Sequence, residues 1–406
     1  MIRSHIVLLA AIAVSAVSQS SIFAVLPPLA REIGLTDIQI GSIASIAAFC
    51  FVLSAPFLGG LSERRGRVPF IAIGLGVAVV TNLVYAATIL AGLAGTLGAA
   101  TVFALLLGVR ILLNVSWGGM FPAAFAFVAD ATAGRGRAAG AALIGAAFGT
   151  GAILGPAIAW ALTPLGAVAP FIGIALLSFG VLVAVLRSLV DIRPPAGGGP
   201  DALAGDGGLA GAVARLWPFL GIGLAGAMAT VMIQQLTAFR LQDQLGLDTG
   251  AATRQAGIAL TVLAVTTLAA QSLVVWGGER WTPAMLMAVG SAVAAAGSLG
   301  FALAGLPTVP GHWILPLQAA MLAVLGLGVG LILPSNAAAV MQATGDGAQG
   351  RAAGLLNAAL GAGTMAGPVL GTMLYRLGTV LPFILATVLF AFAFALAFGR
   401  RMKMRA

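Results

Sequence analysis

The stretch Gly59–Arg67, GGLSERRGR, lies between two long apolar runs and places four charged residues within five positions. Its three glycines allow a tight connection whose backbone can approach a neighbouring helix closely. Short loops rich in Lys and Arg between apolar segments stay on the cytoplasmic side of a membrane. The stretch therefore predicts a short cytoplasmic connection between two membrane helices.

Composition excludes a soluble domain. The 406 residues are 60% hydrophobic and 8% charged, and the mean hydropathy is +1.09, whereas soluble domains carry about 25% charged residues. Apolar runs long enough to cross a bilayer recur along the whole chain. We therefore assign the net charge of +9 to membrane topology, and we expect a lipid bilayer and no nucleic acid as the surroundings.

Cysteine and histidine provide no ligand set. The single cysteine, Cys50, lies in an apolar run, and the two histidines, His5 and His312, lie near opposite predicted membrane edges. This pattern predicts no disulfide framework, no metal site and no cofactor. Apolarity continues from the N-terminus through Ala30, so we expect a retained first helix and not a cleaved signal.

Hydropathy predicts twelve membrane spans. They are 6–30, 38–60, 68–92, 98–129, 138–163, 167–188, 214–240, 252–276, 282–304, 313–341, 352–375 and 380–399. If both termini are cytoplasmic, the cytoplasmic segments hold fifteen of the twenty basic residues and the outside segments hold four: Arg31, Arg240, Arg254 and Arg376. This asymmetry favours a bacterial inner-membrane protein with both termini inside. The twentieth basic residue, Arg110, is then the one charge deep in the membrane.

A polar segment rich in Pro and Gly divides the chain. We expect six-span bundles at 1–190 and 214–406, joined by a cytoplasmic linker at 191–213. The halves resemble each other, since GRAAGAALIGAAFGTGAILGP at 136–156 is echoed by GRAAGLLNAALGAGTMAGP at 350–368. Two proline pairs, Pro122 with Pro334 and Pro156 with Pro368, share an offset of 212 residues.

The opening stretch resembles the loop between the second and third helices of the major facilitator superfamily. The matching residues are Gly59, Leu61, Ser62, Glu63, Arg64, Gly66 and Arg67. A generic positively charged loop would explain the arginines but not the glycine spacing. The resemblance implies an all-α membrane protein with twelve transmembrane helices in two pseudo-symmetric six-helix bundles, and a substrate site between the halves at mid-membrane.

The resemblance also implies a cytoplasmic latch that controls the conformational change. In the family the acidic residue of the loop, here Glu63, contacts the start of the eleventh helix, whose N-terminus favours an anion. The second arginine, here Arg67, pairs with an acid at the foot of the fourth helix, for which Asp130 is well placed. Arg64 belongs to the same motif.

The fifth span resembles the motif associated with exporters in this superfamily. Its Gly151, Gly155 and Pro156 match, although the usual trailing Gly-Gly is Ala159-Trp160. Gly367 and Pro368 form a similar pattern in the eleventh span. Small residues four apart let helices approach closely and proline bends a helix, so tight packing is the alternative explanation.

Arg110 resembles the arginine that opens an R-x-x-Q-G motif in the family's fourth helix, where it is implicated in proton coupling. Here the continuation ends in Leu113-Asn114, so Gln and Gly are missing. A charge at this depth costs at least ~2.5–3.5 kcal/mol and normally faces a cavity or a partner. A structural arginine bonded to helix carbonyls is the alternative. Because we place all eleven acidic residues in loops or at helix ends, the central charge favours neutral, zwitterionic or anionic substrates.

Six polar or aromatic residues in predicted cavity-lining spans join Arg110 as substrate-binding candidates. They are Gln19, Asn114, Trp117, Gln234, Gln235 and Asn336. Each could instead bond a neighbouring helix, an interaction worth about 0.6 kcal/mol on average.

Together these features predict a secondary transporter that works by alternating access. No constellation of an enzyme is visible, and a channel would not explain the two-fold repeat. We expect a monomeric, proton-coupled exporter of small amphipathic or anionic metabolites, such as siderophore-like carboxylates or drugs, driven by the proton gradient. An importer or facilitator of the same solutes is the alternative. The proton carrier would be a peripheral acid such as Asp130 or Asp243, or the substrate itself.

Overall fold

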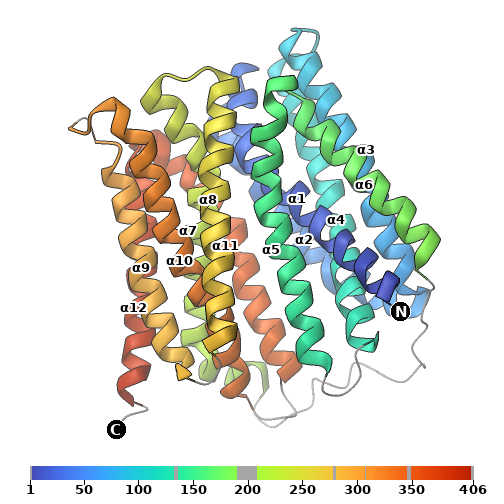
Figure 1. Ribbon diagram of the computed structural model, residues 1–406, viewed down its shortest axis with the longest axis vertical. Helices are drawn as coiled ribbons and strands as arrows, with labels where there is room; N and C mark the ends of the chain where they lie inside the picture. Colours follow the sequence, from blue (N-terminus) through green and yellow to red (C-terminus); the bar gives the residue numbers. More distant parts are fainter. Residues whose placement is uncertain are drawn as a thin grey trace. The chain divides into compact units, whose positions relative to one another are not determined.

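The computed structural model describes residues 2–131, 136–189, 208–277, 280–306, 308–344 and 349–403. Within these ranges the chain forms twelve α-helices, one short 3-10 turn and no β-strand (Figure 1). The helices are α1 (Ile2–Glu32), α2 (Asp37–Arg65), α3 (Arg67–Leu93), α4 (Ala99–Ala131), α5 (Gly136–Leu162), α6 (Ala169–Ser188), α7 (Gly208–Leu245), α8 (Thr249–Gly277), α9 (Pro283–Leu303), α10 (Gly311–Gln342), α11 (Gln349–Leu377) and α12 (Leu381–Lys403). The predicted all-α fold is confirmed, and each predicted span overlaps one helix.

Every helix contains an apolar segment long enough to cross a bilayer. Large apolar side chains also stay exposed on the helix surfaces, including Phe57 at 78%, Val275 at 68% and Leu186 at 64%. Extended apolar surface of this kind is unfavourable in water and favourable against lipid chains. The chain is therefore a multi-pass membrane protein.

Local sequence explains where several helices begin and end. Thr36 starts α2 with a capping box, in which its hydroxyl accepts from the Gln39 backbone and the Gln39 side chain accepts from the Thr36 backbone. Gly66 separates α2 from α3 at φ 100°, a conformation that glycine adopts without strain. Thr282 caps α9 directly before Pro283, which suits the first helical turn.

The internal repeat extends to the helix boundaries. Adding 212 to the bounds of α2 gives 249–277, which are the bounds of α8. The same addition turns α4 into 311–343, within one residue of α10, and moves the start of α6 to 381, where α12 begins. The two sequence halves therefore encode the same order of helices in the same register.

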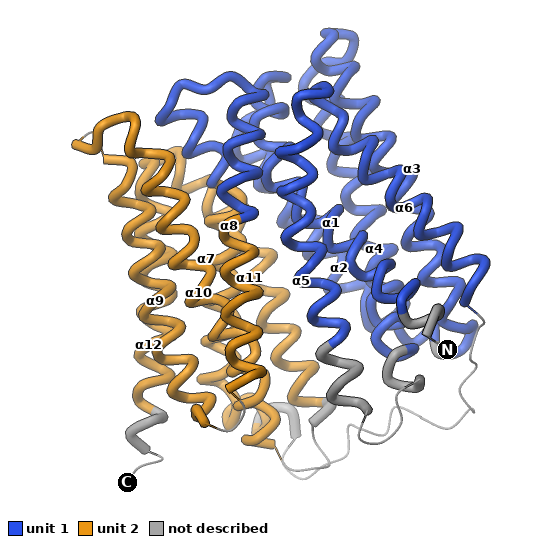
Figure 2. Tube along the Cα trace, in the orientation of Figure 1, with its two compact units in different colours: residues 1–196, 237–261 blue, residues 197–236, 262–406 orange. Residues whose placement is uncertain are grey.

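The contacts divide the chain into two compact units (Figure 2). Unit 1 holds residues 1–196 and 237–261, and unit 2 holds residues 197–236 and 262–406. Most of the predicted linker, residues 191–207, lies outside the described part of the chain. Residues 208–213, predicted as linker, already belong to α7, because the Leu and Ala that follow Gly208 are good helix formers.

In unit 1, α1 packs along α5, while α4 contacts both α2 and α3, and α3 contacts α6. A buried cluster between α1, α3, α4 and α6 contains Leu8, Ile71, Trp117 and Phe127. Large apolar side chains thus fill the interior of this bundle.

In unit 2, α9 packs against both α10 and α12. Glycines permit the closest approaches: a Cβ on Gly297 would lie 2.9 Å from the Leu325 Cα, and one on Gly367 would lie 2.7 Å from the Met228 carbonyl oxygen. Helices in a bilayer associate through such close backbone contacts, because lipid provides no hydrophobic force between them.

Candidate functional site

Arg110 lies inside unit 1, on α4, and only 3% of it is exposed. Its Nη2 donates a hydrogen bond to Gln19 Oε1 on α1 at 2.8 Å. Its guanidinium carbon lies 5.9 Å from the centre of the Trp117 ring, within the range of a cation–π contact. Two other predicted substrate-binding residues, Gln19 and Trp117, therefore lie beside the buried positive charge of Arg110.

The surroundings of Arg110 are polar but neutral. Asn114 Nδ2 donates to the Arg110 carbonyl oxygen at 3.0 Å, which ties its amide to its own helix. Among the described side chains, no carboxylate lies within ion-pair distance of the Arg110 guanidinium. Trp117 Nε1 is buried and has no hydrogen-bond partner within the described part of the chain. The site therefore offers donors and a net positive charge.

Two further polar contacts, which sequence reasoning missed, hold helices around Arg110. Asn82 Nδ2 on α3 donates to Ser18 Oγ on α1 at 3.2 Å. The Tyr85 hydroxyl on α3 donates to the Leu106 carbonyl oxygen, one turn before Arg110 on α4, at 3.2 Å. These polar residues within apolar spans were the available signal, but the sequence does not reveal which helices they join.

The three candidates in unit 2 have different environments. Gln235 is buried and Gln234 is half-buried on α7. Asn336 is 3% exposed, and its Nδ2 donates to the Phe219 carbonyl oxygen at 3.0 Å. Its Oδ1 has no partner among the described residues. Substrate binding by these three residues stays a prediction, while the helix–helix bond of Asn336 is observed.

The glycines of α5 face α1 at van der Waals contact. A Cβ on Gly151 would lie 2.6 Å from the Ala16 Cβ, and one on Gly155 would lie 2.6 Å from the Val17 carbonyl oxygen. Ser20 Oγ also donates across the same interface to the Gly151 carbonyl oxygen at 3.3 Å. Pro156 follows as a buried residue inside α5. The close packing that this motif predicts is present.

A second cluster lies at the end of α1 and was missed from the sequence. Arg31 bonds Asp37 through Nε at 2.7 Å and Nη2 at 2.8 Å. Its Nη1 donates to Asp243 Oδ1, near the end of α7, at 2.7 Å. Its guanidinium carbon lies 4.1 Å from the centre of the Phe239 ring. One arginine thus joins the ends of α1 and α7, both within unit 1.

Arg240, which the sequence analysis assigns to an outside segment, lies inside a helix of the structure. α7 runs to Leu245, and Arg240 lies within it with 1% of the residue exposed. Arg240 is thus buried inside the protein, as Arg110 is, and its position relative to the membrane stays a prediction.

Comparison with known families identifies the fold. The sequence model of the Major Facilitator Superfamily matches residues 8–321 and, in a second overlapping match, residues 254–405. The chain belongs to this superfamily. It is accordingly a membrane transporter and not an enzyme.

Known relatives match part of the sequence or the fold alone. The chain is 29% identical over 176 residues to the class C tetracycline resistance protein of Escherichia coli, covering 43% of this chain and 41% of that protein. It is 30% identical over 188 residues to the class G protein of Vibrio anguillarum, covering 45% and 44%. Each match thus spans less than half of the relative. The inward-facing, occupied structure of a bacterial homologue of the human lysosomal transporter Spinster superposes with a TM-score of 0.74 at 14% identity, covering 97% of this chain and 95% of that one.

The stretch Gly59–Arg67, predicted as a short connection, is mostly helical: α2 continues to Arg65, Gly66 alone separates the helices, and α3 begins at Arg67. A Cβ on Gly59 would lie 3.3 Å from the Pro122 Cβ on α4, so this glycine lies against a neighbouring helix. Arg64 is exposed, whereas Arg67 is 6% exposed. The side chains of Glu63 and Asp130 lie outside the described part of the structure, so the predicted latch stays a prediction.

Proposed function

We propose that this transporter exports small anionic or amphipathic molecules across the bacterial inner membrane, driven by the proton gradient. The observation that carries the proposal is the buried Arg110, whose one described side-chain hydrogen bond goes to the neutral amide of Gln19. Family membership supports transport, and the character of this site supports the substrate class.

The charge argument favours an anion. Keeping a guanidinium in the membrane interior costs at least ~2.5–3.5 kcal/mol on insertion scales, and Gln19 accepts from only one of its five N–H donors. The remaining donors have the geometry to bind a carboxylate or phosphate in a bidentate manner, and the indole of Trp117 adds another. A permanent cation at this position would be repelled.

Two observations support export as the direction. The α5 glycine pattern, with Gly151 and Gly155 packed on α1, resembles the exporter motif of the superfamily. The partial relatives are resistance proteins, and resistance to a drug is what an exporter provides. For the proton, we propose a peripheral acid, Asp130 or Asp243, or the substrate itself as the carrier, as the sequence suggests.

The decisive experiment compares Arg110→Ala and Arg110→Lys with the wild type. A deletion strain carrying each variant is grown in the presence of toxic carboxylates, neutral compounds and cations. One anionic and one neutral compound against which the wild-type gene protects the strain are then tested in proteoliposomes, with and without a pH gradient. Arg254→Ala is the matched control, because Arg254 is exposed at the start of α8. Everted membrane vesicles that accumulate the compound under a proton gradient would support export, and uptake by right-side-out vesicles would support import.

We expect Arg110→Ala to weaken transport of the anion by about 10–100-fold, the equivalent of one charge-assisted hydrogen-bond pair of about 1.5–3 kcal/mol. Arg110→Lys should keep part of the activity, since it preserves the charge but loses the planar fork. Equal transport of both compounds by Arg110→Ala and wild type would refute the anion assignment and leave Arg110 a structural residue.

A further inference from the structure

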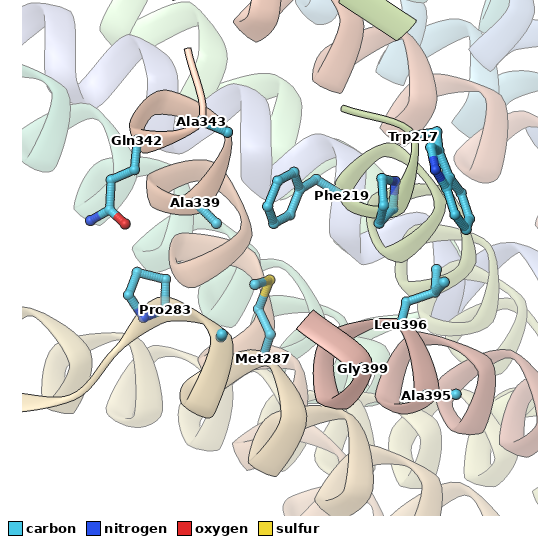
Figure 3. Close-up of a pocket in the computed structure, with 12 residues that line it drawn as sticks. Trp217, Phe219, Pro283, Met287, Ala339, Gln342, Ala343, Ala395, Leu396 and Gly399 are labelled. Carbon is cyan, nitrogen blue, oxygen red and sulfur yellow. The ribbon is translucent and has the colours of Figure 1, made fainter. Parts of the chain in front are cut away.

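Unit 2 contains a pocket of about 550 Å³ at one end of its helix bundle (Figure 3). It lies where α9 begins and where α10 and α12 end, beside the early part of α7. The side chains of Phe219 and Met287 face the same space. The walls are apolar, and Gln342 supplies the one side-chain amide among the twelve lining residues. This volume is that of a small-molecule site.

The internal repeat relates one wall position of the pocket to the filled cluster of unit 1. With the offset of 212, Ala339 in the pocket wall corresponds to Phe127, which is 4% exposed in the filled cluster of unit 1. Ala397, which follows the lining residue Leu396 in the sequence, corresponds to Val185, a member of the same cluster. At these two positions the second half thus carries a smaller side chain than the first half.

Basic and aromatic residues lie close in sequence to the wall of the pocket. Arg215 and Arg280, which shortly precede the wall residues Trp217 and Pro283, are both exposed. Trp217 itself is 52% exposed, and tryptophan is enriched at the membrane–water interface.

We propose that this pocket binds an anionic phospholipid, with one acyl chain in the apolar space and the phosphate at Arg215 and Arg280. An apolar cavity with a basic, tryptophan-bearing mouth is complementary to a molecule that has an apolar chain and an anionic head. Basic pockets between transmembrane helices are the known setting for acidic lipid head groups. The bilayer supplies that molecule at the predicted cytoplasmic end. The proposal concerns a site separate from Arg110 and does not depend on the transported substrate.

Two kinds of variant test the proposal. Ala339→Phe restores the residue of the first half and should fill the pocket, while Ala338→Phe is its control, because Ala338 is the exposed neighbour on α10. The double variant Arg215→Gln/Arg280→Gln removes the charges, and Arg376→Gln, an exposed arginine in the last turn of α11, is its control. Lipid retention by the full-length purified protein is measured by native mass spectrometry with phosphatidylglycerol and phosphatidylcholine of identical acyl chains.

For the wild type we expect tighter binding of phosphatidylglycerol by up to about 25-fold, since each basic residue contributes roughly fivefold. Ala339→Phe should lose one retained lipid, and the arginine double variant should lose most of the preference for phosphatidylglycerol, whereas both controls should match the wild type. Equal binding of the two lipids by the wild type would overturn the proposal. An undiminished preference for phosphatidylglycerol in the arginine double variant would overturn it as well, even if Ala339→Phe failed to fold. If the purified protein bound inorganic phosphate but retained neither lipid, the site would be an anion site and not a lipid site, which would also contradict the proposal.

Discussion

Substituting Gly151 by alanine tests whether the α1–α5 contact controls both stability and transport. The added Cβ would lie 2.6 Å from the Ala16 Cβ and closer still to the Ala13 carbonyl oxygen. Neither atom can rotate away, because one is the first side-chain atom and the other belongs to the helix backbone. The two helices must therefore move apart by about 1 Å to reach an ordinary carbon–carbon separation of about 3.5–4.0 Å.

The magnitude follows from a matched pair of variants. A gap of about 0.5–1 Å forfeits a quarter to a half of the dispersion energy of each contact it opens, and overpacking costs about 1–3 kcal/mol. Gly145, also on α5, has no atom within 4 Å of the position that a Cβ would occupy, so Gly145→Ala carries the same gain in helix propensity without the clash. The difference between the two variants isolates the clash, and we expect about 2–3 kcal/mol.

The assay is unfolding by titration with a denaturing detergent, which reports the free energy of unfolding of each variant. Transport should fall with stability only for Gly151→Ala, because Gln19 lies on α1 directly beyond the contact with Gly151, and a displacement of about 1 Å would break its 2.8 Å bond to Arg110. If Gly151→Ala unfolds at the same free energy as Gly145→Ala, the helices do not pack as closely as the structure indicates, and the reasoning fails.

Two further substitutions probe the other polar contacts. Arg31→Ala should lower the free energy of local opening at the ends of α1 and α7 by about 1–2 kcal/mol, the scale of a small ion-pair network with a cation–π contact. A cysteine introduced as Leu35→Cys in a Cys50→Ser background should therefore react with a thiol reagent about 5–30-fold faster in the variant. An unchanged rate, or the same rise in the exposed control Arg254→Ala, would contradict this. Asn336→Ala should lower the free energy of unfolding by about 1 kcal/mol through loss of the bond to Phe219. Ser335→Ala, whose hydroxyl bonds Leu331 of its own helix, should cost less, and equal costs would argue against the helix–helix role of Asn336.

The fold was predictable because its signals are local. Apolar run length specifies the helices, Gly66 and Thr36 mark their ends, and the glycine spacing of α5 indicates a close helix contact before any partner is known. The chemistry of the site was only partly predictable. Gln19 and Arg110 were both candidates, but the bond between them depends on how α1 and α4 pack, which no pattern within either helix encodes.

Arg31 shows how the repeat could have predicted more. Its partner Asp243 lies 212 residues later, so the two residues occupy the same position in the two halves of the sequence and bond to each other. In a symmetric arrangement a residue meets its own equivalent only at the symmetry axis. Two residues of the same charge at that axis would repel each other, whereas an acid and a base attract. An acid in one half and a base at the equivalent position of the other half therefore indicate a contact between the two residues. Arg240 has no such signal. Its repeat equivalent is Pro28, which carries no charge, so the burial of Arg240 depends on tertiary packing that the repeat does not reveal.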